Sequence, residues 1–278
     1  MGSAVAVVTD STAYLPPGLA ERQRLTIVPL QLAIGGELRA EGEITAAEAL
    51  KDRHPVTTSR PAPERFAHAF KAAAGAGADA VVSVHLAASM SGTIEAARLA
   101  AKDAPVPVHV VDSGTIGLGL GFAALSAAAA ALDGASAPDV IAAAERRAEL
   151  SRSLFYVDTL EHLRRGGRIG AAATLLGSAL MVKPLLGIDG GRIAPLEKVR
   201  TSSRALSRLT EIAVAEAGER HVDLGVQHLA APARAEALAQ NLRERIPHVG
   251  DVYVGEVGPV IGAHVGPGML GVVVAPHL

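Results

Sequence analysis

The chain of 278 residues contains no cysteine and no tryptophan, and aromatic residues make up only 3% of it. Without cysteine, no disulfide framework, thiolate nucleophile or cysteine-ligated metal site can form. Hydrophobic residues make up 49% of the chain, so its core must be built from aliphatic side chains. Any pocket in such a core is expected to be lined by aliphatic carbon rather than by stacking rings.

An excess of positive charge and a long apolar run are absent as well. The formal net charge is −2 and lysine and arginine are dispersed, which argues against a broad nucleic-acid-binding surface. No uninterrupted apolar stretch reaches the length that crosses a membrane, and the N-terminus lacks the basic segment of a secretory signal. We therefore expect a cytoplasmic protein with no integral membrane segment.

Apolar segments of strand length alternate with helical segments along the chain. Val5–Val8 and Ala80–Leu86 are apolar throughout, which is typical of strands in a parallel sheet covered on both faces. Leu25–Ala33 is predicted to form one strand, with Pro29 at an edge or a bulge. Leu118–Leu132 is predicted to form a buried, alanine-rich helix.

The second half of the chain is predicted to contain a hairpin and further strands and helices. Lys183–Ile188 and Arg192–Val199 flank the turn Asp189-Gly190-Gly191 and predict two paired strands. The length suits two modest domains. We expect an α/β fold of two α/β domains: residues 1–155 with a mostly parallel sheet, and residues 156–278 with a mixed sheet.

Four segments in the first 120 residues are rich in hydroxyl and acidic side chains: Thr9–Thr12, Thr57–Ser59, Ser89–Thr93 and Asp112–Thr115. Three of them directly follow apparent strands, whereas the second is interpreted as a loop. Open α/β sheets bind ligands at the carboxyl ends of their strands, so one hypothesis is that all four segments converge. The alternative is that loops simply favour serine and threonine.

The segment Ser89-Met90-Ser91-Gly92-Thr93 is the strongest candidate for an anion site. It follows an apolar strand and opens a helix on Gly92 or Thr93, where backbone N–H groups are unpaired and the helix end carries partial positive charge. Together with the hydroxyl groups, this arrangement suits one oxyanion. We interpret the segment as a carboxylate-binding corner with an apolar pocket behind it.

A serine-dependent lipid or ester hydrolase is the alternative from another class, with Ser91 as nucleophile and His264 as base. Ser91 does not lie in a G-x-S-x-G motif, and no acid lies near His264 in the sequence. His264 lies between glycines and prolines, where the backbone is expected to turn tightly. It is either a structural histidine or a donor to an anion.

Other kinds of site have weaker support. The ten histidines show neither H-E-x-x-H nor paired spacing, so no metal site and no cofactor is expected. Gly117–Gly121 only weakly resembles a dinucleotide loop, and its glycines are expected to allow close packing of a helix. Arg164–Arg168 either ends a helix or supplies charge to a carboxylate or a phosphate, and the spacing leaves both open.

The succession of motifs resembles the DegV family of bacterial lipid-binding proteins, the fatty-acid-binding subunits of fatty acid kinase. The resemblance runs from Val5 to Val274. The motifs that carry it are Val8-Thr9-Asp10-Ser11-Thr12, Thr57-Thr58-Ser59-Arg60-Pro61, Ser89-Met90-Ser91-Gly92-Thr93, Val111-Asp112-Ser113, Phe155-Tyr156-Val157-Asp158-Thr159-Leu160, Arg165-Gly166-Gly167-Arg168-Ile169, Lys183-Pro184 and Gly262-Ala263-His264-Val265-Gly266-Pro267-Gly268. Arg60 departs from the glutamine that is commoner in the family.

The resemblance implies a protein that is not itself an enzyme and that holds one long-chain fatty acid, such as palmitate, between its two domains. The residues that it assigns to the fatty acid are Thr58, Ser91, Gly92, Thr93, His264 and Arg168. A fatty acid kinase subunit, which carries the ATP and Mg²⁺, would phosphorylate the carboxylate that this protein presents, in phospholipid metabolism. The resemblance leaves open whether Arg165 or Arg168 lies nearer the carboxylate.

Overall fold

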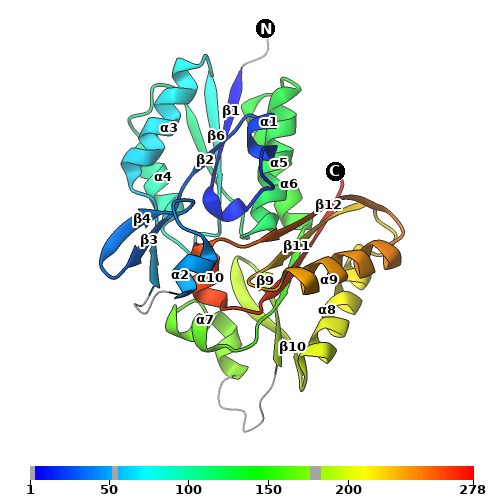
Figure 1. Ribbon diagram of the computed structural model, residues 1–278. Coiled ribbons are helices and arrows are strands. Elements are labelled where there is room, and N and C mark those ends of the chain that lie inside the picture. The colour runs from blue at the N-terminus through cyan, green and yellow to red at the C-terminus, as the bar shows by residue number, and fades with distance from the viewer. Residues whose placement is uncertain (1–3, 52–55, 176–182) are drawn as a thin grey trace.

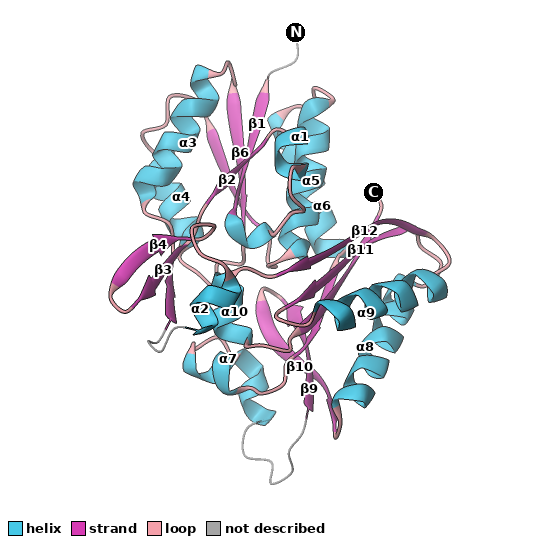
Figure 2. Cartoon of the chain, in the orientation of Figure 1, coloured by secondary structure: helices cyan, strands magenta, loops and turns pink. Residues whose placement is uncertain are grey.

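A four-stranded parallel sheet forms the upper half of the molecule in Figures 1 and 2, which show the computed structural model. The model describes residues 4–51, 56–175 and 183–278. In spatial order the strands are β2 (Leu25–Val28), β1 (Val5–Asp10), β6 (Ala80–His85) and β7 (Val108–Asp112). The short helices η1 (Ser11–Ala13) and α1 (Leu19–Arg22) connect β1 to β2.

Both faces of this sheet are covered by helices, as its apolar strands predict. Val8 and Val81 pack with α3 (Pro63–Gly75) and α4 (Thr93–Ala101) on one face. On the other face, Val7 and Val82 belong to a second cluster, with side chains of α5 (Leu118–Leu132) and α6 (Ala137–Leu150). Because every second residue turns to the opposite face, strands buried on both sides must be apolar throughout.

The prediction of one strand over Leu25–Ala33 is wrong. β2 ends at Val28, and after Pro29 the chain enters β3 (Gln31–Ile34), which belongs to a separate antiparallel sheet of order β4-β3-β5. Proline has no N–H to give to a ladder, so the sheet is interrupted there. The segment Thr57–Ser59, interpreted as a loop, lies in β5 (Val56–Ser59).

This small sheet is completed by β4 (Glu37–Ala40) and followed by α2 (Ala46–Lys51). Thr45 caps α2: its hydroxyl accepts the Glu48 N–H at 3.2 Å, and the Glu48 carboxylate accepts the Thr45 N–H at 2.8 Å. This reciprocal pair is a capping box.

A six-stranded mixed sheet forms the second half of the molecule. In spatial order its strands are β10 (Arg192–Val199), β9 (Lys183–Asp189), β8 (Arg152–Tyr156), β13 (Leu270–Pro276), β11 (Val222–His228) and β12 (Val249–Glu256). The predicted hairpin is confirmed, with Gly190 and Gly191 at positive φ in its turn. The predicted division between residues 155 and 156 falls inside β8, whose partners both belong to this sheet.

The two faces of the six-stranded sheet have different coverings. One face packs against α8 (Ser202–Ala217) and α9 (Pro232–Arg245), through alternate residues such as Leu154, Val226 and Val272. The opposite face, which includes Phe155, turns toward the first half of the chain and packs with α7 (Glu161–Arg165), η2 (Gly170–Leu175) and α10 (Pro259–Val265). We call this second face the inner face.

Helix α10 corrects the expectation of a tight loop around His264. Pro259 stands in its first turn, where a missing N–H costs nothing, and Gly266 ends it with a φ of +74°. His264 therefore stands in the last turn of a helix. Among the described residues, no helix is both long enough and apolar enough to cross a membrane.

Candidate functional site

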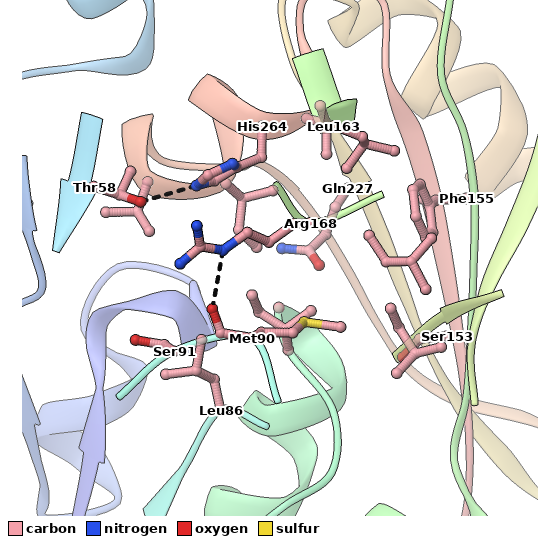
Figure 3. A pocket seen from close by; sticks show the side chains of 18 of the residues that line it. Thr58, Leu86, Met90, Ser91, Ser153, Phe155, Leu163, Arg168, Gln227 and His264 are labelled. Carbon is pink, nitrogen blue, oxygen red and sulfur yellow. Dashed lines mark hydrogen bonds between the residues drawn. The ribbon is translucent and has the colours of Figure 1, made fainter. Parts of the chain in front are cut away.

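A pocket opens between the loops of the first half and the inner face of the six-stranded sheet (Figure 3). About 1030 Å³ of space lies within it, open solvent at its mouth included. Most of its lining is aliphatic, as the composition predicts. Side chains of this kind are Leu86, Met90, Ile116, Leu163, Ile188 and Met269.

Thr58 and His264 meet at the polar end of this pocket. Oγ1 of Thr58, in β5, lies 2.9 Å from Nε2 of His264, in α10, although 206 residues separate them in the chain (Figure 3). Burial, and next the positive charge of Arg168, lower the pKa of His264 to about 4. The imidazole is therefore neutral at pH 7, and one of its nitrogens carries a proton.

The other nitrogen of His264 is buried against Gly166. Nδ1 has no hydrogen-bond partner among the described residues. A Cβ on residue 166 would overlap this nitrogen, so only glycine leaves room for the ring. Gly166 is a site residue that sequence reasoning missed, because its effect depends on a histidine almost a hundred residues away.

Arg168 lies between His264 and Met90 in Figure 3. Its Nε donates to the Met90 carbonyl at 3.2 Å and its Nη1 to the Gly166 carbonyl at 2.8 Å (Figure 3). Arg164 instead pairs with Glu161 at 2.6 Å, at the end of α7. The first part of the basic segment therefore ends a helix, and Arg168 lines the pocket. That the segment supplies charge to a carboxylate or a phosphate stays a prediction.

The helix-opening segment contributes Ser91 and Gly92 to the lining. Ser91 Oγ lies 2.9 Å from Oγ1 of Thr93, which is fully buried and does not itself line the pocket. Gly92 is the N-cap of α4, and a Cβ there would lie 3.1 Å from the Arg60 side chain. Arg60 therefore lies directly over the start of this helix.

The hypothesis that four hydroxyl-rich segments converge at one sheet edge holds for the three that follow β1, β6 and β7 of the parallel sheet, and is wrong for Thr57–Ser59, which lies in β5 of a separate sheet. Thr9–Thr12 and Asp112–Thr115 contribute nothing to the described lining. Asp10 is fully buried and accepts from the Leu86 N–H at 3.0 Å, which ties β1 to the end of β6. Ser89, too, donates elsewhere, to the Gly191 carbonyl in the β9–β10 turn.

Hydrolase chemistry finds little support in this arrangement. In a serine triad the base contacts the nucleophile and an acid holds its other nitrogen. Here His264 contacts Thr58 rather than Ser91, and among the described residues no acid reaches Nδ1.

The glycines before and within α5 also behave as predicted for close packing, since a Cβ on Gly121 would lie 2.9 Å from the Ala13 carbonyl oxygen.

Two further polar side chains of the lining lie on the inner face. Ser153 of β8 and Gln227 of β11 stand among apolar residues of the pocket wall. Sequence reasoning missed both. The available signal was the alternation in Val222-Asp223-Leu224-Gly225-Val226-Gln227, which places the polar side chains of Asp223 and Gln227 on one face of the strand.

Comparison with known proteins identifies the family. A model described as a DegV family of uncharacterised proteins matches residues 4–277, almost the whole chain. The chain belongs to the DegV family. A DegV domain-containing protein of Streptomyces coelicolor is 57% identical over 279 aligned residues, covering 99% of each protein.

Solved structures of DegV proteins share the whole fold. A DegV family protein of Thermus thermophilus, described by its fatty acid binding, matches with a TM-score of 0.93, 34% identity and full coverage of both chains. DegV of Bacillus subtilis, described as a fatty acid binding protein, matches with a TM-score of 0.90 and 34% identity over 99% of this chain and 100% of its own. The two-domain α/β architecture is therefore that of DegV proteins.

Proposed function

We propose that this DegV protein binds one long-chain fatty acid in the pocket between its two domains and does not itself act on it. The observation that carries this proposal is the Thr58–His264 pair, which puts hydrogen-bonding groups at one end of a largely aliphatic pocket. Two related structures described as fatty acid binding proteins support the ligand class.

The carboxylate would lie against Thr58, Ser91 and His264, near the N-cap Gly92 of α4. We assign the imidazole proton to Nε2, because a proton on Nδ1 would have no acceptor among the described residues. Nε2 then donates to Thr58, whose own hydroxyl proton is free to donate to the ligand. Thr93 would act indirectly, by fixing the Ser91 hydroxyl, and Arg168 would supply positive charge.

The acyl chain would fill the aliphatic part of the pocket. Burial of each CH₂ group is favourable by about 0.8 kcal/mol, so a sixteen-carbon acid gains roughly 12 kcal/mol before ordering costs. An unpaired carboxylate is expensive to bury, which explains why several donors gather at one end. The head group would thus set orientation, and the chain would supply most of the binding free energy.

We further propose that the protein is the acyl-presenting subunit of a fatty acid kinase in the cytoplasm, feeding phospholipid metabolism. ATP and Mg²⁺ would belong to the kinase partner. Ser59, Arg60 and Arg168 are exposed and line the pocket, which supports a carboxylate held close to the surface. A partner could then reach the carboxylate while the chain stays buried.

Calorimetric titration of delipidated protein tests the proposed head-group site. We expect palmitate to bind at one site per chain and methyl palmitate, which lacks the charge, to bind at least tenfold more weakly. A hydrogen bond to a charged group contributes about 1.5–3 kcal/mol, so Thr58→Val should weaken palmitate binding about 10- to 100-fold. Equal affinities for acid and ester, or a Thr58→Val variant with normal affinity, would contradict the head-group assignment.

A further inference from the structure

Gln227 holds a buried amide nitrogen that nothing in the described part of the chain satisfies. Its side chain lies in the pocket wall, and the residue is only 6% exposed. Oε1 accepts the Leu118 N–H at 2.9 Å, whereas Nε2 has no partner among the described residues. A buried donor without an acceptor lowers stability. A ligand with an acceptor atom at this position would satisfy the amide.

The orientation of the amide is fixed by the start of α5. If the oxygen and nitrogen exchanged places, the NH₂ group would face the Leu118 N–H, donor against donor. Gly117 lies on the same side of the amide as Leu118, since a Cβ on Gly117 would lie 2.5 Å from Oε1 of Gln227. The nitrogen therefore points away from α5. In Figure 3 the Gln227 amide lies among the lining side chains, between Arg168 and Phe155 in this view.

Strand register places Gln227 beside a glycine of the pocket lining. Gln227 pairs with Gly271 of β13, and Gly271 pairs on its other edge with Phe155 of β8. Paired residues point to the same face and neighbouring strands lie about 4.8 Å apart. Gly271 has no side chain, so Gln227 and Phe155 flank a position at which the tip of the Met269 side chain lies 3.3 Å from where a Cβ would stand.

The other polar side chain of this wall, Ser153, differs from the Gln227 amide nitrogen in having a hydrogen-bond partner. Ser153 Oγ lies 3.2 Å from Thr115 Oγ1. Along the strands it stands two residues from Phe155, opposite Val273 rather than Gly271. Ser153 is therefore a matched control: it is a polar side chain on the same face, but its hydrogen bond is already made.

We propose that the preferred ligand is an oxygenated fatty acid, with a hydroxy or oxo group along its chain that accepts a hydrogen bond from Nε2 of Gln227. The inference rests on the proposed function, which puts the carboxylate at the Thr58–His264 end. A plain acyl chain brings only C–H groups past this amide and leaves the donor unpaired. An oxygen at the matching carbon satisfies the donor, whereas an oxygen at any other carbon is buried in aliphatic lining at a cost.

Binding of a positional series tests the inference. Delipidated protein is titrated with stearic acid and with stearic acids that carry one hydroxy or one oxo group at successive chain positions. We expect one position, or two adjacent positions, to bind at least tenfold more tightly than stearic acid, and the remaining isomers to bind more weakly. If stearic acid binds as tightly as every oxygenated isomer or more tightly, the inference is refuted, while the proposed function stands.

Two substitutions locate the preference. Gln227→Leu removes the donor and should bring the favoured isomer to the level of stearic acid or below it. Gln227→Met keeps a side chain of similar length without an N–H donor, and should lose the preference even if Gln227→Leu folds poorly. Ser153→Ala should keep the preference for the favoured isomer over stearic acid.

A preference that survives both Gln227 substitutions, or that disappears in Ser153→Ala, would refute the assignment to this amide. If the protein binds none of these acids, stearic acid included, the proposed function fails and the inference fails with it. Stearic acid alone therefore reports on the proposed function, and the ratio of isomer to stearic acid reports on Gln227.

Discussion

The pH dependence of the free energy of unfolding should show that His264 is buried in its neutral form. In the folded protein its pKa is lowered from 6.5 to about 4, by burial and then by Arg168. Between these two pH values the His264 imidazole is mostly protonated in the unfolded chain and mostly neutral in the folded chain. The free energy of unfolding therefore falls as the pH falls from about 6.5 toward 4, and is unaffected by this group above about pH 7.

The pKa shift of His264 determines how much unfolding free energy is lost on acidification. One pKa unit corresponds to about 1.4 kcal/mol, so the full loss from this group is about 3 kcal/mol, and about 2–3 kcal/mol of it is reached by pH 4.5. Urea denaturation of delipidated protein at pH 7 and pH 4.5 measures it. His264→Gln should lose about 2–3 kcal/mol less than wild type over this interval, because other titrating groups are unchanged.

An exposed histidine provides the control. His109 lies at an exposed position of β7, so His109→Gln should reproduce the wild-type loss between the two pH values. If His264→Gln shows the same pH dependence as wild type, the imidazole is not buried in its neutral form and the reasoning about the site is wrong.

Two other substitutions test how His264 is held. Gly166→Ala puts a Cβ into Nδ1 of His264 and should weaken palmitate binding at least tenfold by calorimetry. The control Gly75→Ala, with nothing within 4 Å of its Cβ, should leave the affinity unchanged. Normal affinity in Gly166→Ala would contradict the packing argument. Glu41 accepts the Val260 N–H at 2.9 Å at the start of α10. Glu41→Ala leaves that donor unpaired and should lower the free energy of unfolding by about 1–3 kcal/mol in urea, and an unchanged value would show that this contact contributes nothing.

The regular elements could be predicted because their signals are local. Continuous apolar runs identify β1 and β6, and the Gly-Gly turn identifies the β9–β10 hairpin. The start of α2 is equally local, since Thr45 and Glu48 are three residues apart. In each case the residues that decide the structure stand within one segment.

The errors occur where distant segments decide the structure. Pro29 moves the chain from one sheet to another, but the second sheet depends on β5, almost thirty residues later. The glycines around His264 suggested a loop, whereas α10 forms because it packs against other parts of the chain. Gln227 becomes part of the pocket only through pairing with Gly271, and no local pattern contains that register.

Mass spectrometry of lipid extracted from the purified full-length chain tests the central claim most directly. We predict one long-chain fatty acid per chain in wild-type protein and a clear loss of it in Thr58→Val prepared in parallel. Wild-type protein that carries no acyl chain, and that fails to take one up when fatty acid is added after purification, would contradict the account.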